Sequence, residues 1–249
     1  RDQTVRPVIV KTATSGYDGH GQMRLDAPEC VTQTLPESKS VSAVAEDLVD
    51  FELELSVIGV RSQSGEFCSF GPIINDHSDH ILDVSVTPSG ELSKQQHSDA
   101  VEITRCILES LDVTGVLTVE MFLTTSGQLL VNELAPRPHN SGHLTIEAAQ
   151  TSQFEQQVRC VCGLPAGSMQ QLQPAAMANL LGQHLSDTPD WGALANQPDV
   201  HWHLYGKRRT VPGRKMGHLT ATADSPRQAE LLVRGARQQL SGSRKRTHQ

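Results

Sequence analysis

The chain has 249 residues, of which 37% are hydrophobic and 20% are charged, so its composition is that of a folded globular protein and excludes general disorder. Its formal net charge of -7 gives no overall attraction to nucleic acid or to anionic lipid. The longest apolar runs fall far short of the roughly 20 residues that span a bilayer, and we find no signal segment. We expect a cytoplasmic protein with no membrane and no nucleic-acid partner, in which a local site holds any anionic ligand.

The five cysteines do not form a CxxC pair, which favours reduced thiols over a disulfide framework or a zinc site. They are Cys30, Cys68, Cys106, Cys160 and Cys162. The chain begins at Arg1, without Met, only a few residues before an expected strand. From this we predict that upstream sequence is missing.

In chain order, the β-branched residues 5–12 predict a strand, followed by the glycine-dense loop 15–22 and a second strand. Residues 51–60 alternate between apolar and polar, as a strand does. The apolar spacing over residues 98–111 predicts a helix with Ser98 as its N-cap.

Two β-rich runs flank Ser126-Gly127, and this pattern predicts a hairpin. Ser152 and Glu155 form a capping-box pattern that opens a helix, which Gly163 and Pro165 close. Residues 166–176 mark a domain junction. A last helix is predicted from Ser225 at the N-cap, Pro226 at N1 and Gln228 at N3, before a disordered tail at 241–249. The predicted domains are residues 1–165 and 176–240.

A turn centred between Ser126 and Gly127 predicts that Glu120 and Glu133 face each other across the hairpin. The other predicted pairs are Leu123 with Leu130, Phe122 with Val131, and Met121 with Asn132. Two opposed carboxylates repel, and a divalent cation such as Mg²⁺ between them removes that repulsion. Asn132 adds a third oxygen. The alternative is a solvated pair on an outer face.

The loop glycines Gly16, Gly19 and Gly21 allow a backbone to approach phosphate oxygens closely, and Lys11 would add a positive charge. The pattern is neither GxxxxGK[ST] nor GxGxxG before a helix, which excludes a P-loop and a Rossmann fingerprint. A plain flexible hairpin tip remains the alternative.

The segment NELAPRPHNSGH at 132–143 fixes polar side chains with two prolines after an acidic strand end, as small-molecule sites often do. A basic cluster around a Pro-Gly turn suits a phosphate group, with an ordinary solvated turn as the alternative. Its members are Lys207, Arg208, Arg209, Arg214 and Lys215. Together these features indicate an enzyme that binds a nucleoside triphosphate with a divalent cation under a glycine-rich flap and transfers phosphoryl groups.

Six segments in this order resemble the N5-carboxyaminoimidazole ribonucleotide synthase family of ATP-grasp enzymes. They are KTATSGYDGHGQ, ELELSVI, NDHSDHILD, VEMFLTTSGQLLVNELAPRPHNSGH, TSQFEQQVRCVCGLP and HLYGKRRTVPGRKMGH. The resemblance implies an α/β (α+β) ATP-grasp fold with a small C-terminal domain. It also implies that an N-terminal Rossmann-like domain is missing.

The resemblance implies a ligase of purine biosynthesis that uses ATP and Mg²⁺ or Mn²⁺ to carboxylate 5-aminoimidazole ribonucleotide with bicarbonate, through carboxyphosphate. The ATP site it implies is Lys11, Gly16, Gly19, His20, Gly21, Gln22, Glu46, Asp47, Leu48, Val49, Glu54, His77, Asn132 and Glu133. The metal ligands would be Glu120 and Glu133, the catalytic residues Tyr17, Asp18, Arg137, His139 and Asn140, and the ligands of the substrate phosphate Lys207 and Arg214.

The sequence departs from the family at Ala13, Thr14 and Ser15, where the family has two Arg and a Gly, and at His20, where Lys or Arg is common. We therefore expect fewer positive charges to contact the ATP phosphates than in the family.

The resemblance also implies a homodimer. Two other functions stay open: a non-catalytic ATP-binding or assembly module, and another ATP-grasp carboxylate-amine ligase. From the 249 residues alone we expect little or no turnover.

Overall fold

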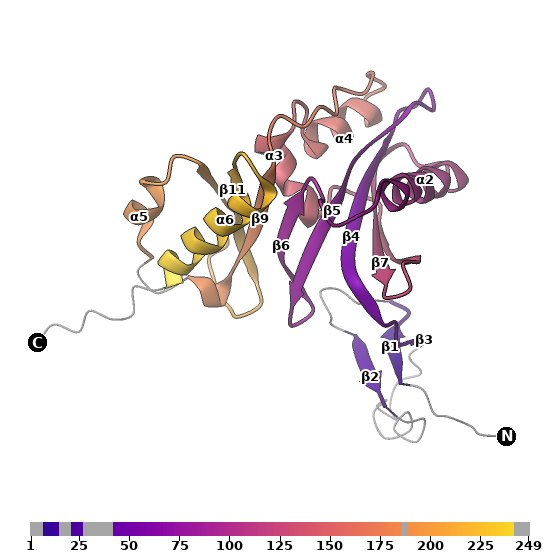
Figure 1. The fold of residues 1–249 in the computed structure, drawn as a ribbon, viewed down its shortest axis with the longest axis horizontal. Coiled ribbons are helices and arrows are strands. Elements are labelled where there is room, and N and C mark those ends of the chain that lie inside the picture. Colours follow the sequence, from indigo (N-terminus) through magenta and orange to yellow (C-terminus); the bar gives the residue numbers. More distant parts are fainter. Residues whose placement is uncertain (1–6, 15–20, 27–41, 186–188, 242–249) are drawn as a thin grey trace, which may run out of the picture. The chain divides into compact units, whose positions relative to one another are not determined.

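The computed structural model describes residues 7–14, 21–26, 42–185 and 189–241, and these fall into two compact units (Figure 1). The first unit comprises Arg1–Phe51 and Ser78–Ile81, and the second comprises Glu52–His77 and Leu82–Gln249. The tail at 242–249 lies outside the described residues. The fold class expected from the sequence, a mixed α/β structure, is confirmed.

The first unit holds a three-stranded antiparallel sheet in the order β2-β1-β3. The strands are β1 (Val8–Thr12), β2 (Gln22–Leu25) and β3 (Ala43–Asp47). The Thr12 amide donates to the Gly21 carbonyl at 2.8 Å, which joins β1 to β2 at the end where the glycine-dense loop connects them. Two strands joined by that loop were predicted from the sequence.

The second unit is built on an eight-stranded sheet in the order β10-β11-β9-β6-β5-β4-β7-β8. Its strands are β4 (Phe51–Arg61), β5 (Phe67–Ser78), β6 (Ile81–Thr87), β7 (Gly115–Thr124), β8 (Leu129–Ala135), β9 (Ala175–Leu181), β10 (Val200–Leu204) and β11 (Lys215–Thr222). Its helices are α2 (Lys94–Ser110), η2 (Asn140–Leu144), α3 (Thr145–Ala148), α4 (Gln153–Val161), η3 (Gly182–His184), α5 (Trp191–Ala195) and α6 (Pro226–Ser241).

Strand alternation divides the core between the two faces of this sheet. On one face Val57 packs with Leu108 of α2, and Ala178 packs with Val233 of α6. On the other face Ile58 packs among residues of η2, α3 and α4. The short helices η2 and α3 therefore lie over the same face as the even-numbered side chains of β4 and β7, and this is the face that carries the candidate site.

Helix α2 begins five residues earlier than predicted. Its N-cap is Ser93, whose side chain accepts from the Gln96 amide while the Gln96 side chain accepts from the Ser93 amide. Ser98 lies inside the helix, so the prediction of Ser98 as N-cap was wrong. The reciprocal pair satisfies two amides that lack a helical partner, an advantage that Ser98 with Val101 three residues later does not offer.

The other helix ends follow the sequence signals. Ser152 caps α4 by accepting from the Glu155 amide, and Gly163 follows the helix with a φ of 71°. Helix α6 begins at Pro226, where the Ser225 hydroxyl accepts from the Gln228 amide at 3.3 Å.

None of the described helices is long and apolar enough to cross a membrane. Of the cysteines, those at 68, 106, 160 and 162 are free, and Cys30 lies outside the described residues.

An ion-pair network centred on Asp83 of β6 joins helix α6 to the sheet. Arg237 donates to the Asp83 carboxylate at 2.5 and 2.8 Å, and Arg234 donates to it at 3.2 Å. The side chains of Asp83 and Arg237 are 14% and 12% exposed, so solvent screens the pair only weakly. Burial raises the pKa of Asp83, but the hydrogen bond and charge of Arg237 and the charge of Arg234 bring it below the ordinary value.

We expect Asp83→Asn to lower the free energy of unfolding by about 3 kcal/mol at pH 7, because it removes the charge of the carboxylate that pairs with the buried Arg237. Since the folded pKa is the lower one, the stabilisation is present above the unfolded value of 3.8 and is lost as pH falls through the folded value. Urea unfolding of both proteins at neutral and acidic pH measures this. A difference that persists undiminished in strong acid would contradict it.

Candidate active site

Glu120 on β7 and Glu133 on β8 are direct cross-strand partners, as predicted. The predicted pairs nearer the turn were wrong by one residue, because Leu123, Phe122 and Met121 lie opposite Leu129, Leu130 and Val131. The turn is longer than predicted: Thr124 donates to Gln128 across it, and Gly127 takes a φ of 81°. A bulge at Asn132 then restores the register at the two glutamates.

His139 lies against the Glu120 carboxylate, with Nε2 at 3.0 Å from Oε1. The two side chains are 12% and 15% exposed. Burial raises the pKa of Glu120, but the hydrogen bond from His139, together with the charges of His77 and Lys215, brings it below its usual value. Glu120 is therefore held as a carboxylate, the form that a cation requires.

Asn140 begins η2 beside His139 and is buried, 8% exposed. Neither its side-chain oxygen nor its nitrogen has a hydrogen-bond partner within the part of the chain that the structure describes. Leaving a buried amide unpaired costs about 1–3 kcal/mol, so such a group indicates a missing ligand or water. Arg137 is exposed, and its guanidinium donates to the Pro138 carbonyl at 3.0 Å.

Gln153, the first residue of α4, fixes the backbone of this loop. Its side-chain oxygen accepts from the His139 amide at 2.9 Å and its nitrogen donates to the His139 carbonyl at 2.7 Å. Gly142 makes the close approach possible, because a Cβ there would lie 2.2 Å from Ile58 and 2.6 Å from Gln153. Nothing in the local sequence marked Gln153, since its contact spans 14 residues.

Glu54 on β4 and His77 on β5 form an ion pair on the same sheet. Burial lowers the pKa of His77, but the contact with Glu54 and the charges of Glu54 and Glu120 outweigh it, so the pKa is raised above its ordinary value. Lys215 on β11 lowers the pKa values of both Glu120 and His77, which places its charge near them. Sequence reasoning included Lys215 in the basic cluster but not in the site.

The segment between β10 and β11 carries Lys207 and Arg214. The Lys207 ammonium donates to the Lys215 carbonyl at 2.5 Å and lies 5.4 Å from the centroid of the Tyr205 ring. Arg214 is exposed, and its guanidinium donates to the Arg209 carbonyl at 3.2 Å. Both cations belong to the connection between β10 and β11.

Three histidines link the strands β10 and β11 to η2 and α3: His203 on β10, His218 on β11 and His143 on η2. His218 stacks on His203 with centroids 4.5 Å apart and lies 4.8 Å from His143. His203 is in turn bonded to Glu147 of α3 at 2.6 Å. Burial is the main cause that lowers the pKa of His143 to about 4 and the pKa of His218 to about 3, so both rings are neutral in the folded protein at neutral pH.

These two histidines predict a loss of stability in mild acid. Their folded pKa values lie below the unfolded value of 6.5, so the unfolded chain takes up protons that the folded chain does not. Their contribution is present above pH 6.5 and falls by about 2 kcal/mol per histidine by pH 5. Urea unfolding at the two pH values measures it. His218→Leu should remove about half of the decrease in unfolding free energy that the two histidines cause between pH 6.5 and pH 5. The exposed control His201→Gln should leave that decrease unchanged. Equal decreases in both variants would contradict the assignment of the pH dependence to the buried histidines.

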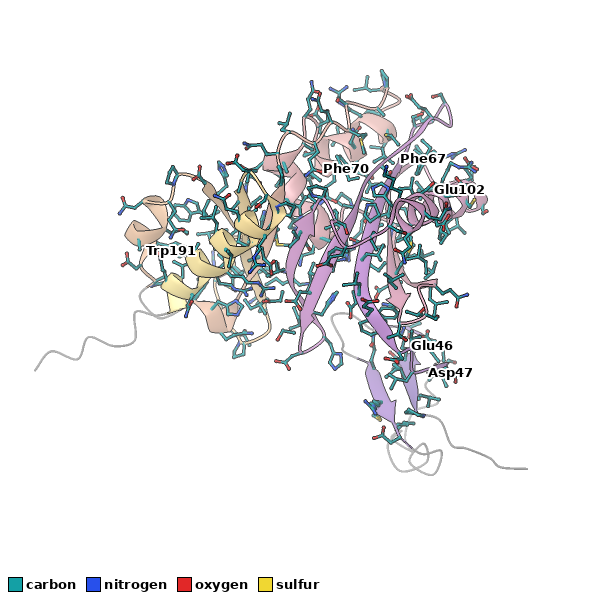
Figure 2. The ribbon with its side chains drawn as sticks, viewed as in Figure 1. Glu46, Asp47, Phe67, Phe70, Glu102 and Trp191 are labelled. Atoms are coloured by element: carbon teal, nitrogen blue, oxygen red, sulfur yellow. The ribbon has the colours of Figure 1, made fainter. Side chains whose placement is uncertain are left out.

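In the first unit, Lys11 of β1 and Glu46 of β3 form an ion pair of 2.6 Å. Ile9 is opposite Glu46, which places Glu46 and Lys11 on one face of that sheet. Glu46 and Asp47 follow one another at the end of β3 (Figure 2). The rest of the predicted hinge, Leu48 and Val49, follows β3, with the Leu48 amide donating to the Pro7 carbonyl.

Most of the predicted glycine-dense loop belongs to the part of the chain that the structure does not describe. Gly16, Tyr17, Asp18, Gly19 and His20 lie outside the described residues, and Gly21 and Gln22 begin the described segment that follows them. Gly21 has a φ of 80°, a conformation that glycine adopts without strain.

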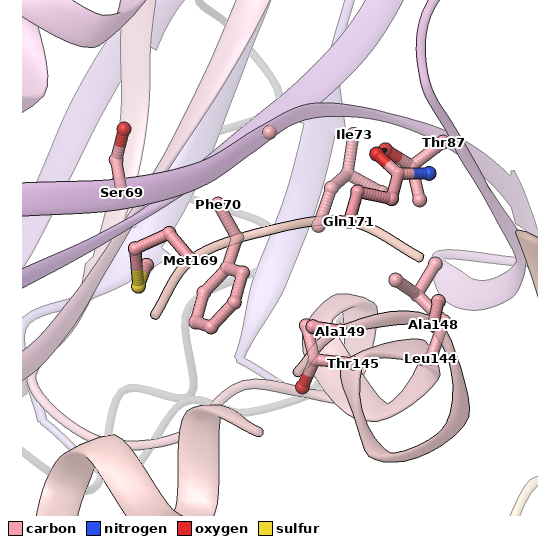
Figure 3. A pocket seen from close by; sticks show the side chains of 11 residues that line it. Ser69, Phe70, Ile73, Thr87, Leu144, Thr145, Ala148, Ala149, Met169 and Gln171 are labelled. Carbon is pink, nitrogen blue, oxygen red and sulfur yellow. Dashed lines mark hydrogen bonds between the residues drawn. The ribbon is translucent and has the colours of Figure 1, made fainter. Parts of the chain in front are cut away.

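A cavity of about 150 Å³ lies between β5, β6, η2 and α3 (Figure 3). Its lining combines apolar side chains such as Phe70, Ile73 and Leu144 with neutral polar ones such as Thr145 and Gln171, and no charged residue is among them. It has none of the groups that the predicted chemistry needs. The candidate site therefore lies around Glu120, Glu133 and His139, and not in this cavity.

This arrangement of acidic hairpin, polar loop and antiparallel sheets agrees with the comparisons. The model of the ATP-grasp domain matches residues 2–154, more than half of the chain, and the chain belongs to the ATP-grasp family. A second model, the phosphoribosylaminoimidazole carboxylase C-terminal domain, matches residues 175–231.

Within that family, similar proteins include N5-carboxyaminoimidazole ribonucleotide synthases. The one from Bacillus subtilis is 42% identical over 214 residues, which cover 86% of this chain and 56% of that protein. A carboxyaminoimidazole ribonucleotide synthase of Aspergillus clavatus complexed with ATP superposes with a TM-score of 0.84 at 33% identity, covering 96% of this chain and 63% of that one. The Aspergillus clavatus synthase in complex with ADP and 5-aminoimidazole ribonucleotide superposes with a TM-score of 0.81 at 31% identity. The match covers 92% of this chain and 61% of that one. The resemblance read from the motifs is confirmed, and the chain spans roughly three fifths of these relatives' lengths.

The family implies a divalent cation, and the residues present fit one. Glu120 and Glu133 face each other on one side of the hairpin, and Glu120 is held ionised. One or two carboxylates completed by phosphate oxygens are the usual protein ligands of Mg²⁺ in nucleotide sites. Among the residues that the structure describes, no group of three or more His, Cys, Asp or Glu side chains forms a metal cage by itself. The donor set therefore suits a cation that arrives with a nucleotide.

Proposed function

We propose that this protein uses ATP to carboxylate 5-aminoimidazole ribonucleotide with bicarbonate. The observation that carries the proposal is the pair Glu120 and Glu133 beside a loop that brings His139 to 3.0 Å from Glu120. Within the described residues, the same loop leaves the buried Asn140 amide without a hydrogen-bond partner. A carboxylate pair suits a nucleotide-bound cation, and the adjacent donors suit a small oxyanion. The relatives' names supply the identity of the amine and the acid.

The reaction has two transfers. An oxygen of bicarbonate attacks the γ-phosphorus of ATP, the bond to the β-phosphate oxygen breaks, and ADP leaves. The resulting carboxyphosphate releases phosphate and carbon dioxide, and the amine of the ribonucleotide attacks that carbon and loses a proton. Bound Mg²⁺ or Mn²⁺ supplies charge neutralisation and orientation of the phosphates.

The chain's own residues divide this work. Glu120 and Glu133 hold the cation, while Arg137, His139 and Asn140 bind bicarbonate and stabilise the negative charge that develops on it. Lys207 and Arg214 bind the ribonucleotide phosphate as cations from one connection. Lys11, the loop 16–22, the hinge 46–49, Glu54 and His77 bind the nucleotide, and Tyr17 and Asp18 face the substrates. The homodimer and the cytoplasmic location expected from the sequence stay predictions.

ADP formation tests the proposal. The protein is assayed in two forms: the chain itself, and a joined form that carries the part of the Bacillus subtilis relative that this chain does not match. With ATP, Mg²⁺, bicarbonate and 5-aminoimidazole ribonucleotide, we expect the joined form to produce ADP only when both the bicarbonate and the ribonucleotide are present. ADP formation no greater than that of a Glu133→Ala control in both forms would overturn the proposal. Indifference to the ribonucleotide would point to a ligase for another amine.

A further inference from the structure

A chain of buried, uncharged side chains crosses the sheet beneath the candidate site and ends at His139. Its members are Ser85 of β6, Asn75 of β5, Ser56 of β4 and Ser141 of η2, all at most 5% exposed. The successive contacts are Ser85 Oγ to Asn75 Oδ1 at 2.9 Å, Asn75 Nδ2 to Ser56 Oγ at 3.0 Å, Ser56 Oγ to Ser141 Oγ at 2.8 Å and Ser141 Oγ to His139 Nδ1 at 2.9 Å.

A backbone amide favours one direction for the hydrogen bonds in this chain of side chains. The amide of Ser141 also lies against His139 Nδ1, at 3.3 Å, and a backbone N–H can only donate. A lone pair on Nδ1 satisfies this amide, although the contact is longer than that of the Ser141 hydroxyl at 2.9 Å. Because a neutral imidazole carries one N–H, the hydrogen of His139 is on Nε2.

The hydrogen-bond donors and acceptors of Asn75, Ser56 and Ser141 are all paired when each residue donates to the next one toward His139. Asn75 donates to Ser56, which donates to Ser141, so the only hydrogen of the Ser141 hydroxyl is left for His139 Nδ1. The reverse order would place a hydrogen on Nδ1 facing the Ser141 amide. Two donors facing each other in a buried position is an arrangement that folded proteins avoid.

The other ring nitrogen faces the site. His139 Nε2 lies 3.0 Å from Glu120 Oε1, and a carboxylate oxygen is an acceptor. In this structure the N–H is donated to Glu120, and an oxygen of bicarbonate or of its phosphorylated form that binds beside Glu120 would share it, since both are oxyanions.

We propose that Ser141, Ser56 and Asn75 are positioning residues that hold His139 in the Nε2–H form, so that it donates a hydrogen bond to a reactant oxygen and does not serve as a base at that nitrogen. The identity of the reactant rests on the proposed function. The position of the hydrogen does not, because it follows from contacts within the chain.

Nitrogen NMR of the chain with ¹⁵N-labelled histidine tests the position of the hydrogen without any turnover. At neutral pH we expect His139 Nδ1 to resonate as a nitrogen without hydrogen and Nε2 as a nitrogen that carries one. In Ser141→Ala, which removes the closer donor, the separation between the two nitrogen shifts should shrink as both forms become populated. A hydrogen-bearing Nδ1 in the wild-type chain would overturn the proposal.

Two further serine variants serve as controls in the same experiment. Ser85→Ala also removes a buried hydroxyl, but at the far end of the chain of contacts, so the His139 shifts should match those of the wild type. Ser56→Ala frees the Ser141 hydroxyl to accept, and should reduce the separation even if Ser141→Ala does not fold. Unchanged His139 shifts in every folded variant among Ser141→Ala and Ser56→Ala would overturn the positioning role.

Substitution of His139 itself tests what the donor does. The amide nitrogen of Gln reaches the position of Nε2, whereas that of Asn reaches only the position of Nδ1. In the ADP assay of the joined form, His139→Gln should retain at least about tenfold more activity than His139→Asn, since one lost hydrogen-bond donor is worth at least that much in rate. Equal losses would overturn the donor role. Absence of ADP in the wild type as well would contradict the proposed function and leave the NMR result standing.

Discussion

Glu133→Gln should lower the rate of ADP formation by the joined form about a hundredfold or more. The substitution keeps the size of the side chain but removes one of the two opposed charges that would hold the cation against the phosphates. Because Glu133 is exposed, the free energy of unfolding should stay within about 0.5 kcal/mol of the wild type. Steady-state rates at several Mg²⁺ concentrations measure the effect, and the variant should require more Mg²⁺ for half-maximal activity.

Glu102→Gln is the matched control for this prediction. Glu102 is an exposed carboxylate on α2, which packs on the opposite face of the sheet, and it pairs with Arg105 of the same helix (Figure 2). Its replacement by the same amide should leave the rate unchanged. If Glu133→Gln and Glu102→Gln retain equal rates and equal Mg²⁺ requirements, the hairpin pair is a solvated acidic pair and holds no cation.

Asn140→Leu should separate stability from activity. Its amide is buried with neither polar atom paired in the described part of the chain, so an apolar side chain of similar size should raise the free energy of unfolding by about 1 kcal/mol. The same change should lower the rate of ADP formation about a hundredfold, because it removes a donor and an acceptor from the site. Urea unfolding and steady-state kinetics on one preparation give both values.

Opposite results would assign Asn140 a structural role. A loss of stability would mean that its amide has partners that stabilise the fold, and an unchanged rate would mean that no reactant binds there. The neighbouring contacts give a comparison, because Gln153 is buried and fully engaged with His139. Gln153→Leu should lose both stability and activity, since it would leave the His139 amide and carbonyl unpaired.

The hairpin shows how far local pattern predicts geometry. Alternation and the Ser126-Gly127 signal predicted two strands and the facing glutamates, all of which the structure has. The one-residue error at Leu123, Phe122 and Met121 arose because the turn is longer than two residues. The bulge at Asn132 adds one residue to β8 and so reverses that shift at Glu120. The predicted pairing of Glu120 with Glu133 was therefore correct because the longer turn and the bulge offset each other.

Contacts between distant segments were beyond sequence reasoning. Ser56 and Ser141 lie 85 residues apart, and His203 and Glu147 lie 56 apart, yet each pair is within hydrogen-bond distance. Such pairs depend on how strands and short helices pack, which no local spacing encodes. Sequence reasoning therefore identified candidate site residues such as His139, but not the buried residues that contact them.

Transfer of ¹⁸O from labelled bicarbonate into inorganic phosphate tests the central claim most directly, because it reports the bond that phosphorylation of bicarbonate forms. In the joined form, with ATP, Mg²⁺ and 5-aminoimidazole ribonucleotide, we expect one labelled oxygen in each phosphate released, as read by mass spectrometry. ADP accompanied by unlabelled phosphate would mean that water or another acceptor takes the phosphoryl group, and would contradict the assignment of Glu120, Glu133 and the His139 loop to bicarbonate activation.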